Sequence, residues 1–437
     1  MRIDIVNGSV VTGDGMSFLE KTSVIVEGGF ISSLPQVQHI PYNVAADRVI
    51  NAREGLIIPG LINIHAHGVS FGPFFPYAWK ELSKERILFN LNTHLLQGTT
   101  TVLNGDGFAL PSEIEAINKI HPMNVKMSTL HTPKNLRAAE VTAGYGLEER
   151  HRKFTAEEAV ALGAVALGEV GSPGTSYGTA EKSFKIGKQI SAQQALALDN
   201  AVLGGSEAEI RKALIEAGLE KMTIEEARRL VDETSVITVG ACCDAIRETV
   251  PYVRKLKIPT LVHTAKETVD AVLYAAKELG PDLIAGHVNH TFTVEETIKV
   301  AKELKRAGSI VEIISADSFG AKQVEATPEL TFALLKEGLV DVITTDFSGG
   351  YHDPILLVLQ KALEEKLITL PKAIHLATGA PAKAIPRVAP NRGLIEPGRV
   401  ADLCVVERDD ISKVRYVLIS GKVVVDEGRL VPNNVNY

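Results

Sequence analysis

The chain has 437 residues, of which 45% are hydrophobic and 23% are charged, and this is the composition of an ordinary globular protein. Its length allows one large domain with a lobe, or two to three ordinary domains. The formal net charge is -7 and the basic residues do not gather into a stripe, so the composition argues against a nucleic-acid partner.

The cysteines and the hydropathy of the chain indicate the cellular compartment in which we expect the protein. The three cysteines, Cys242, Cys243 and Cys404, have the spacing of neither a disulfide framework nor a thiolate zinc site. The N-terminus lacks the layout of a signal peptide, and no uninterrupted apolar run is long enough to cross a bilayer. We therefore expect a cytoplasmic homo-oligomer with a small-molecule substrate and with neither a nucleic-acid nor a membrane partner.

Short strand-like runs occupy both ends of the chain. Those near the N-terminus are IDIVNGSVVTG and TSVIVEGGFISSL, and those in the tail are ADLCVVE, VRYVLISG and KVVVDEG. Hairpin-like strands at both ends predict one small β-lobe assembled from residues 1–57 and 388–437.

Between them, short apolar runs alternate with segments of helical period. The eight runs are residues 61–67, 99–106, 124–133, 164–174, 260–265, 282–290, 309–317 and 340–347. This alternation predicts a parallel sheet, and eight repeats predict a (β/α)₈ barrel over residues 58–387. One connection, at about 175–258, is too long for a single crossover helix. Its helical patterns predict an insertion over the barrel mouth, where we expect it to enclose substrate or contact another subunit.

The first run ends in two histidines, His65 and His67. Alternate side chains of a strand point to the same side, so the two imidazoles face one way. They could hold one metal ion, because His is the commonest metal ligand, or they could bond to nearby backbone or carboxylate groups. This stretch alone leaves both interpretations open.

The other strand ends carry similar groups. Barrel enzymes place their chemistry at the C-terminal ends of the strands. Here those ends carry His65, His67, Glu169, His263, His287 and Asp346. Each residue alone has a structural explanation, such as a helix cap or a turn. Together they form a ligand set for two divalent metal ions, of which zinc is the default and iron or manganese are possible.

Several stretches make the chain similar to the amidohydrolase superfamily of metal-dependent hydrolases. PGLINIHAHG resembles the strand-one signature of that family, and LLQGTTTVLNGD resembles its junction between helix one and strand two. IHLATGAPAKAI and GLIEPGRVADLCVVE resemble its exit from barrel to lobe. The resemblance spans nearly the whole chain. It implies a distorted (β/α)₈ TIM-type barrel with a β-sandwich lobe built from both termini.

Within the superfamily the chain is most similar to the enamidase-like binuclear cyclic amidases, through GEVGSPGT, VHTAKE, GHVNH and TTDFSGG. The resemblance implies one metal on His65, His67 and Asp346. It implies a second metal on His263 and His287, with Glu169 bridging both. Many relatives bridge their metals with a carboxylated lysine, but AVALGEVGSPG contains no lysine. The long insertion departs from this pattern and leaves the substrate open.

The expected reaction is hydrolysis of a carbon–nitrogen bond, most simply in a cyclic amide. A metal-bound hydroxide would attack the carbonyl, and Asp346 would act as general base and pass the proton to the leaving nitrogen. One alternative is a mononuclear deaminase of a heterocycle. Such deaminases place a glutamate three residues after the strand-five histidine, where this chain has Lys266, and Glu267 follows one residue later.

Two further alternatives are an N-acyl deacetylase and a non-catalytic binding protein, and the complete ligand set argues against the latter. Substrate contacts of weaker standing are predicted for His131, Asn289, His290 and Tyr177, while Asp106 and Asp317 are further polar residues near strand ends. For His131 a structural hydrogen bond is an equal alternative. Cys242 and Cys243 are interpreted as packing residues.

Overall fold

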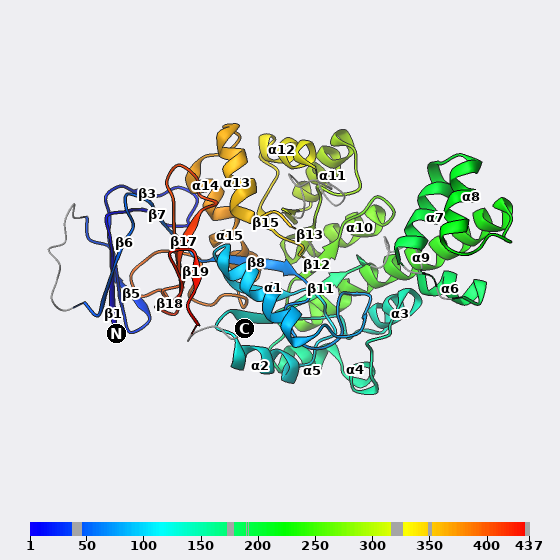
Figure 1. The fold of residues 1–437 in the computed structure, drawn as a ribbon, viewed down its shortest axis with the longest axis horizontal. Coiled ribbons are helices and arrows are strands. Elements are labelled where there is room, and N and C mark those ends of the chain that lie inside the picture. Colours follow the sequence, from blue (N-terminus) through cyan, green and yellow to red (C-terminus); the bar gives the residue numbers. More distant parts are fainter. Residues whose placement is uncertain are drawn as a thin grey trace.

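The computed structural model describes residues 1–36, 46–172, 179–188, 190, 192–315, 327–347 and 352–432. A β-lobe lies at one end of the molecule, a barrel lies in the middle, and helices α7 and α8 lie at the opposite end (Figure 1). The barrel is the part that positions the candidate site.

Eight parallel strands form one sheet in which neighbours in sequence are neighbours in space. They are β8 (Leu61–Ala66), β9 (Thr99–Asn104), β10 (Asn124–Thr129), β11 (Ala166–Val170), β12 (Thr260–His263), β13 (Leu283–Gly286), β14 (Ile310–Ile314) and β15 (Val342–Thr344). The amide of Asp346 donates to the carbonyl of His65 at 3.0 Å, and the amide of His67 donates to that of Phe347 at 2.7 Å. These bonds join the first strand to the end of the last. The expected distorted barrel is confirmed.

Helices surround the sheet, and the longer ones bury an apolar face. They are α1 (Lys84–Leu96), α2 (Pro111–Ile120), α3 (Pro133–Thr142), α4 (Glu149–Lys153), α5 (Ala156–Ala161), α10 (Val269–Leu279), α11 (Val294–Arg306), α12 (Pro328–Lys336), α13 (Ile355–Glu364), α14 (Leu370–Leu376) and α15 (Gly379–Ala384). In α11 the buried residues Thr297, Val300, Ala301 and Leu304 follow helical spacing. The helix begins after Thr293, whose side chain accepts from the amide of Glu296.

The lobe consists of two sheets built from both termini. The four-stranded sheet has the order β5-β4-β1-β6, and the seven-stranded sheet has the order β19-β18-β17-β16-β7-β2-β3. Their bounds are β1 (Arg2–Val6), β2 (Ser9–Val11), β3 (Phe18–Leu19), β4 (Val24–Glu27), β5 (Phe30–Ser33), β6 (Arg48–Asn51), β7 (Leu56–Pro59), β16 (Leu403–Val406), β17 (Val414–Ile419), β18 (Lys422–Asp426) and β19 (Arg429–Leu430). The terminal β-sandwich is therefore confirmed. Its second sheet continues to Pro59, two residues beyond the predicted boundary.

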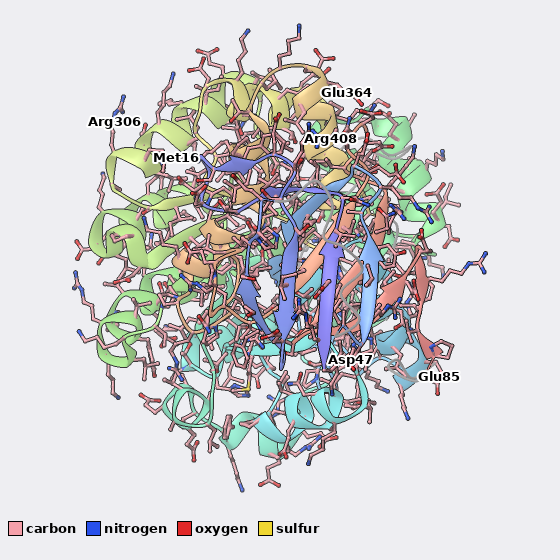
Figure 2. All side chains as sticks on the ribbon, turned by 90° about the vertical axis from the view of Figure 1, so that its left-hand side faces the viewer. Met16, Asp47, Glu85, Arg306, Glu364 and Arg408 are labelled. Carbon is pink, nitrogen blue, oxygen red and sulfur yellow. The ribbon has the colours of Figure 1, made fainter. Side chains whose placement is uncertain are left out.

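The lobe covers the N-terminal ends of the barrel strands. The amide of Gly60 donates to the carbonyl of Asp402, and the thiol of Cys404 donates to the carbonyl of Gly98, the residue before β9. Viewed from this side, the lobe strands stand in front and the barrel helices appear around them, with Arg306 and Glu364 at the outer rim (Figure 2). The mouth of the barrel, formed by the C-terminal strand ends, is therefore on the side away from the lobe.

The long connection between β11 and β12 is helical, as expected. It contains α6 (Thr179–Ile186), α7 (Ala192–Gly204), α8 (Glu207–Glu216) and the long α9 (Ile224–Leu256). Its helices α7, α8 and the start of α9 share a small core of their own, which includes Leu198, Ile210 and Leu230. Helix α9 then returns to the barrel and packs against α3 and α10. A role of this insertion in enclosing substrate stays a prediction.

Among the helices that the structure describes, none has the length and apolar character needed to cross a membrane.

Candidate metal centre

Strand ends bring the six expected ligands together at the barrel mouth. His65 lies in β8 and His67 directly follows it, while Glu169 lies in β11. The remaining three come from the other half of the barrel: His263 ends β12, His287 follows β13, and Asp346 follows β15. All six side chains are buried, except that Asp346 keeps 16% of its side-chain surface exposed. The convergence predicted from the strand count is present.

Glu169 lies between two pairs of imidazoles. Its Oε1 atom is 2.8 Å from Nδ1 of His263 and 2.8 Å from Nε2 of His287. Its Oε2 atom is 3.5 Å from Nε2 of His65 and 3.5 Å from Nε2 of His67. One carboxylate oxygen therefore faces each pair, which is the arrangement required of a group shared by two cations.

Asp346 completes the first pair from the neighbouring strand end, after β15. Its Oδ1 atom lies 3.3 Å from Nε2 of both His65 and His67. The backbone of Asp346 has a φ of +49°, in the left-handed region that Asp and Asn adopt more readily than most residues. The hydrogen bond from the backbone amide of Asp346 to the carbonyl of His65 helps to hold this conformation, in which the carboxylate points at the two imidazoles.

Two outer carboxylates orient these histidines. Asp106 accepts from Nδ1 of His67 at 3.0 Å and from the amides of Gly68 and Phe75. Glu312 accepts from Nδ1 of His65 at 3.0 Å, from the hydroxyl of Thr344 and from the amide of His287. With Nδ1 used in this way, Nε2 is the atom that each ring presents to the centre. Sequence reasoning gave Asp106 only weak standing and missed Glu312.

The free ring atoms indicate what the site can hold. Among the described residues, Nε2 of His65 and Nε2 of His67 are buried and have no hydrogen-bond partner. A buried polar atom without a partner is costly, and a metal ion is one group that would satisfy both atoms. Within the described part of the chain, three groups offer ligand atoms within 4.8 Å of one another. They are His65 with His67 and Asp346, His65 with Glu169 and His287, and His263 with His287 and His290.

The charges at this site are strongly coupled. Burial opposes protonation of His67, but Asp106, Asp346 and Glu169 outweigh it and raise the pKa of His67 to about 10. The pKa of His65 is also raised, because Asp346, Glu312 and Glu169 outweigh its burial. Burial alone would raise the pKa of Glu169, yet the neighbouring charges of His65 and His263 hold it well below its ordinary value. The carboxylate of Glu169 is therefore anionic and suited to cations.

His290 lies beside the second pair of imidazoles. Its ring centre is 5.3 Å from that of His287 and 6.2 Å from that of His263. Burial, with the nearby charges of His287 and His263, lowers the pKa of His290 to about 3. A neutral imidazole at this position can act as a metal ligand or as a hydrogen-bonding group for substrate.

Two other predicted substrate contacts have structural partners. His131 bonds through Nδ1 to the hydroxyl of Thr129 at 3.0 Å and packs edge-on against Phe108 and Phe154. The amide of Asn289 donates to the carbonyl of Ile314 and to the hydroxyl of Thr331, and its oxygen accepts from the amide of Ile314. These contacts favour structural roles for both residues.

The remaining candidates contribute less. Tyr177 and Asp317 lie outside the described residues. Cys242 is fully buried in the main core, which fits the packing role expected of it.

Comparisons with known proteins agree with this architecture. The model of the Amidohydrolase family matches residues 56–424. No curated protein sequence matches the chain. Among solved structures, the chain is similar to a β-aspartyl dipeptidase from Fervidobacterium islandicum AW-1 in complex with a β-Asp-Leu dipeptide, with 14% identity, full coverage of both chains and a TM-score of 0.59.

Two further structures share the fold. An enamidase is 18% identical over 99% of this chain and 98% of its own, with a TM-score of 0.54. A D-aminoacylase with a binuclear metal centre is 13% identical over 99% of this chain and 98% of its own, with a TM-score of 0.58. At these identities the similarity concerns the fold.

Proposed function

The chain belongs to the amidohydrolase family and is a hydrolase of carbon–nitrogen bonds, and we propose that it cleaves a cyclic amide at a centre of two divalent metal ions. The first ion would be held by His65, His67 and Asp346, and the second by His263 and His287. Glu169 would bridge the two. Zinc suits this set of imidazoles and carboxylates, and so do iron and manganese.

The position of Glu169 is the observation that carries the proposal. Its two oxygens face different pairs of imidazoles, at 2.8 Å on one side and 3.5 Å on the other. Two cations held close together repel each other unless an anion lies between them. In β11 the position is filled by a buried carboxylate, whose burial costs free energy unless positive charge compensates it.

Bound divalent ions supply an acidified water as nucleophile and a Lewis acid that polarises the amide carbonyl. The residues of the chain supply the proton transfer. Asp346 keeps part of its side chain exposed and is anionic, because the charge of His65 and the nearby imidazole of His67 outweigh burial and lower its pKa. It can therefore take a proton at a carboxylate oxygen and deliver it to the leaving nitrogen.

The surroundings of Lys266 weigh against a deaminase. Lys266 occupies the place three residues after His263, and its ammonium pairs with Glu296 of α11 at 2.7 Å. Glu267, the next residue, is exposed to solvent. A deaminase of this superfamily would need an acidic side chain directed at the site from this position. Neither Lys266 nor Glu267 provides one.

The experiment that tests the proposal compares the Glu169→Gln variant with wild type in metal content and turnover. Protein purified without chelator is analysed for metal and assayed with lactams, hydantoins, N-acyl amino acids and amino-heterocycles. We expect two ions and cyclic-amide turnover in wild type, and loss of the second ion and most activity in the variant. The exposed Glu365→Gln is the matched control. If wild type binds only one ion, and the Glu169→Gln variant matches it in metal content and turnover, the binuclear centre is overturned and the deaminase is favoured.

A further inference from the structure

The loop that follows β8 is unusually rich in aromatic residues. The stretch FGPFFPYAW, residues 71–79, contains five aromatic residues in nine positions, in a chain that is only 5% aromatic. It also contains Trp79, the single tryptophan of the chain. The loop begins directly after the strand that carries the proposed ligand His65.

Three of these rings form a cluster in contact with a proposed metal ligand. The ring centre of Phe75 is 4.3 Å from that of His67. The ring of Phe75 also stacks with that of Trp79, with ring centres 5.8 Å apart and an angle of 20°. Tyr77 packs edge-on against both rings, at 4.7 and 5.3 Å. We name Phe75, Tyr77 and Trp79 the aromatic cluster. All three residues are partly buried rather than fully buried.

The backbone holds this cluster in place. Phe74 and Trp79 exchange two backbone hydrogen bonds of 2.9 and 2.8 Å, which close the loop between them. The amide of Phe75 donates to Oδ1 of Asp106 at 3.0 Å, and the same oxygen accepts from Nδ1 of His67 at 3.0 Å. Phe75 has a φ of +66°, a conformation that bulky residues rarely adopt, and this bond helps to hold it.

One carboxylate therefore fixes both a proposed metal ligand and the first ring of an apolar surface. We propose that the aromatic cluster is a binding subsite for a planar apolar group of the substrate, such as an aromatic or unsaturated ring. Aromatic side chains bind flat apolar groups by offset stacking or edge contacts. The inference rests on the proposed function, because the scissile amide must lie at Glu169 and Asp346 while its substituent contacts the cluster.

The test uses two hydroxamates, which chelate divalent ions through the same group and differ only in a phenyl or a methyl substituent. Benzohydroxamate and acetohydroxamate are titrated into the zinc-loaded full chain, and the emission of Trp79 is followed. We expect benzohydroxamate to bind roughly tenfold more tightly, which is the scale of one good aromatic contact plus its buried area. We also expect it to change the emission more than acetohydroxamate does.

Two variants locate the effect. Phe75→Leu and Tyr77→Leu should bring the affinity ratio of the two hydroxamates close to one, with the affinity for acetohydroxamate unchanged. Phe89→Leu, which alters an exposed ring on α1, is the matched control and should keep the wild-type ratio. Tyr77→Leu leaves the Phe75–His67 contact in place, so it remains informative if Phe75→Leu disturbs the loop.

The outcomes separate the subsite from the metal centre. If wild type binds both hydroxamates equally well, or if both variants keep the preference for benzohydroxamate, the cluster is only the internal packing of its loop. If neither hydroxamate binds the zinc-loaded protein, the proposed metal centre fails and the subsite fails with it.

Discussion

Nδ1 of His65 lies 3.0 Å from Oε1 of Glu312, a residue 247 positions further along the chain. Glu312 is fully buried in β14, and its other oxygen accepts from the backbone amide of His287. His65 belongs to the first proposed metal and His287 to the second. A single acid that is not itself a ligand therefore positions one ligand of each ion. Such outer carboxylates fix the orientation of a ligating imidazole and raise its basicity.

We expect Glu312→Gln to weaken metal binding without removing any ligand. The amide has nearly the shape of the carboxylate, but it lacks the charge that holds the proton on Nδ1 of His65. The loss in metal affinity should be about 10- to 100-fold. Competition with a chelator, followed by metal analysis, measures it. The exposed Glu365→Gln controls for the chemical change. Equal affinity in Glu312→Gln and wild type would show that Glu312 only satisfies buried donors.

Asp346→Asn should keep the fold and lose most of the turnover. Asn tolerates the left-handed backbone at this position as well as Asp does, so the hydrogen bond from the backbone amide of residue 346 to the carbonyl of His65 can remain. The amide cannot take up a proton, and removal of a general base typically lowers rates by about 10²- to 10⁴-fold. Circular dichroism and thermal melting check the fold, with the exposed Asp232→Asn as control. Near-normal turnover of Asp346→Asn would assign the base to another residue.

The barrel strands and the proposed ligands could be predicted because their determinants are local. A run such as Leu61–Ala66 is apolar throughout, and any barrel brings strand ends to one mouth. Glu312 was missed because IVEII was treated as an ordinary buried strand. A single acid among buried aliphatic residues needs a partner, because burying an unpaired carboxylate costs free energy. That reasoning could have identified Glu312 from the sequence.

The direction of a side chain beyond a strand end was less predictable. Asn289 follows His287, whose φ is +35°, and this turn directs the amide of Asn289 towards the end of β14 rather than the metal centre. Likewise, the aromatic cluster depends on a loop conformation with a positive φ at Phe75, which the residue type disfavours. Tertiary hydrogen bonds decide both cases, and sequence pattern alone does not contain them.

A buried ion pair in the insertion allows a prediction about pH. Nζ of Lys182 in α6 lies 3.0 Å from Oδ1 of Asp199 in α7, and both side chains are fully buried. Burial raises the pKa of Asp199 from 3.8 to about 6, although the charge of Lys182 opposes this. A carboxyl group whose pKa is raised by folding stabilises the fold fully below its unfolded pKa. That contribution is lost as the pH rises through the folded pKa.

We therefore expect Lys182→Met to destabilise the insertion most at pH 8 and less at pH 5. Without the ammonium of Lys182, the pKa of Asp199 rises further. At pH 5 the carboxyl group of Asp199 is protonated and carries no buried charge, whereas at pH 8 an unpaired buried charge destabilises the insertion. Breaking a buried pair costs about 3–5 kcal/mol at a pH where the remaining partner is charged. Hydrogen exchange of the α7 amides, measured at both pH values and corrected for intrinsic rates, reports local opening of this part.

The double variant Lys182→Met with Asp199→Leu is the matched control for this effect. Replacing both members of a buried pair with apolar residues is often neutral or stabilising, because no charge has to be desolvated. The double variant should therefore protect the α7 amides at least as well as wild type, with no added dependence on pH between 5 and 8. If Lys182→Met alone opens α7 equally at both pH values, the loss comes from packing around Lys182 and not from the charge of Asp199.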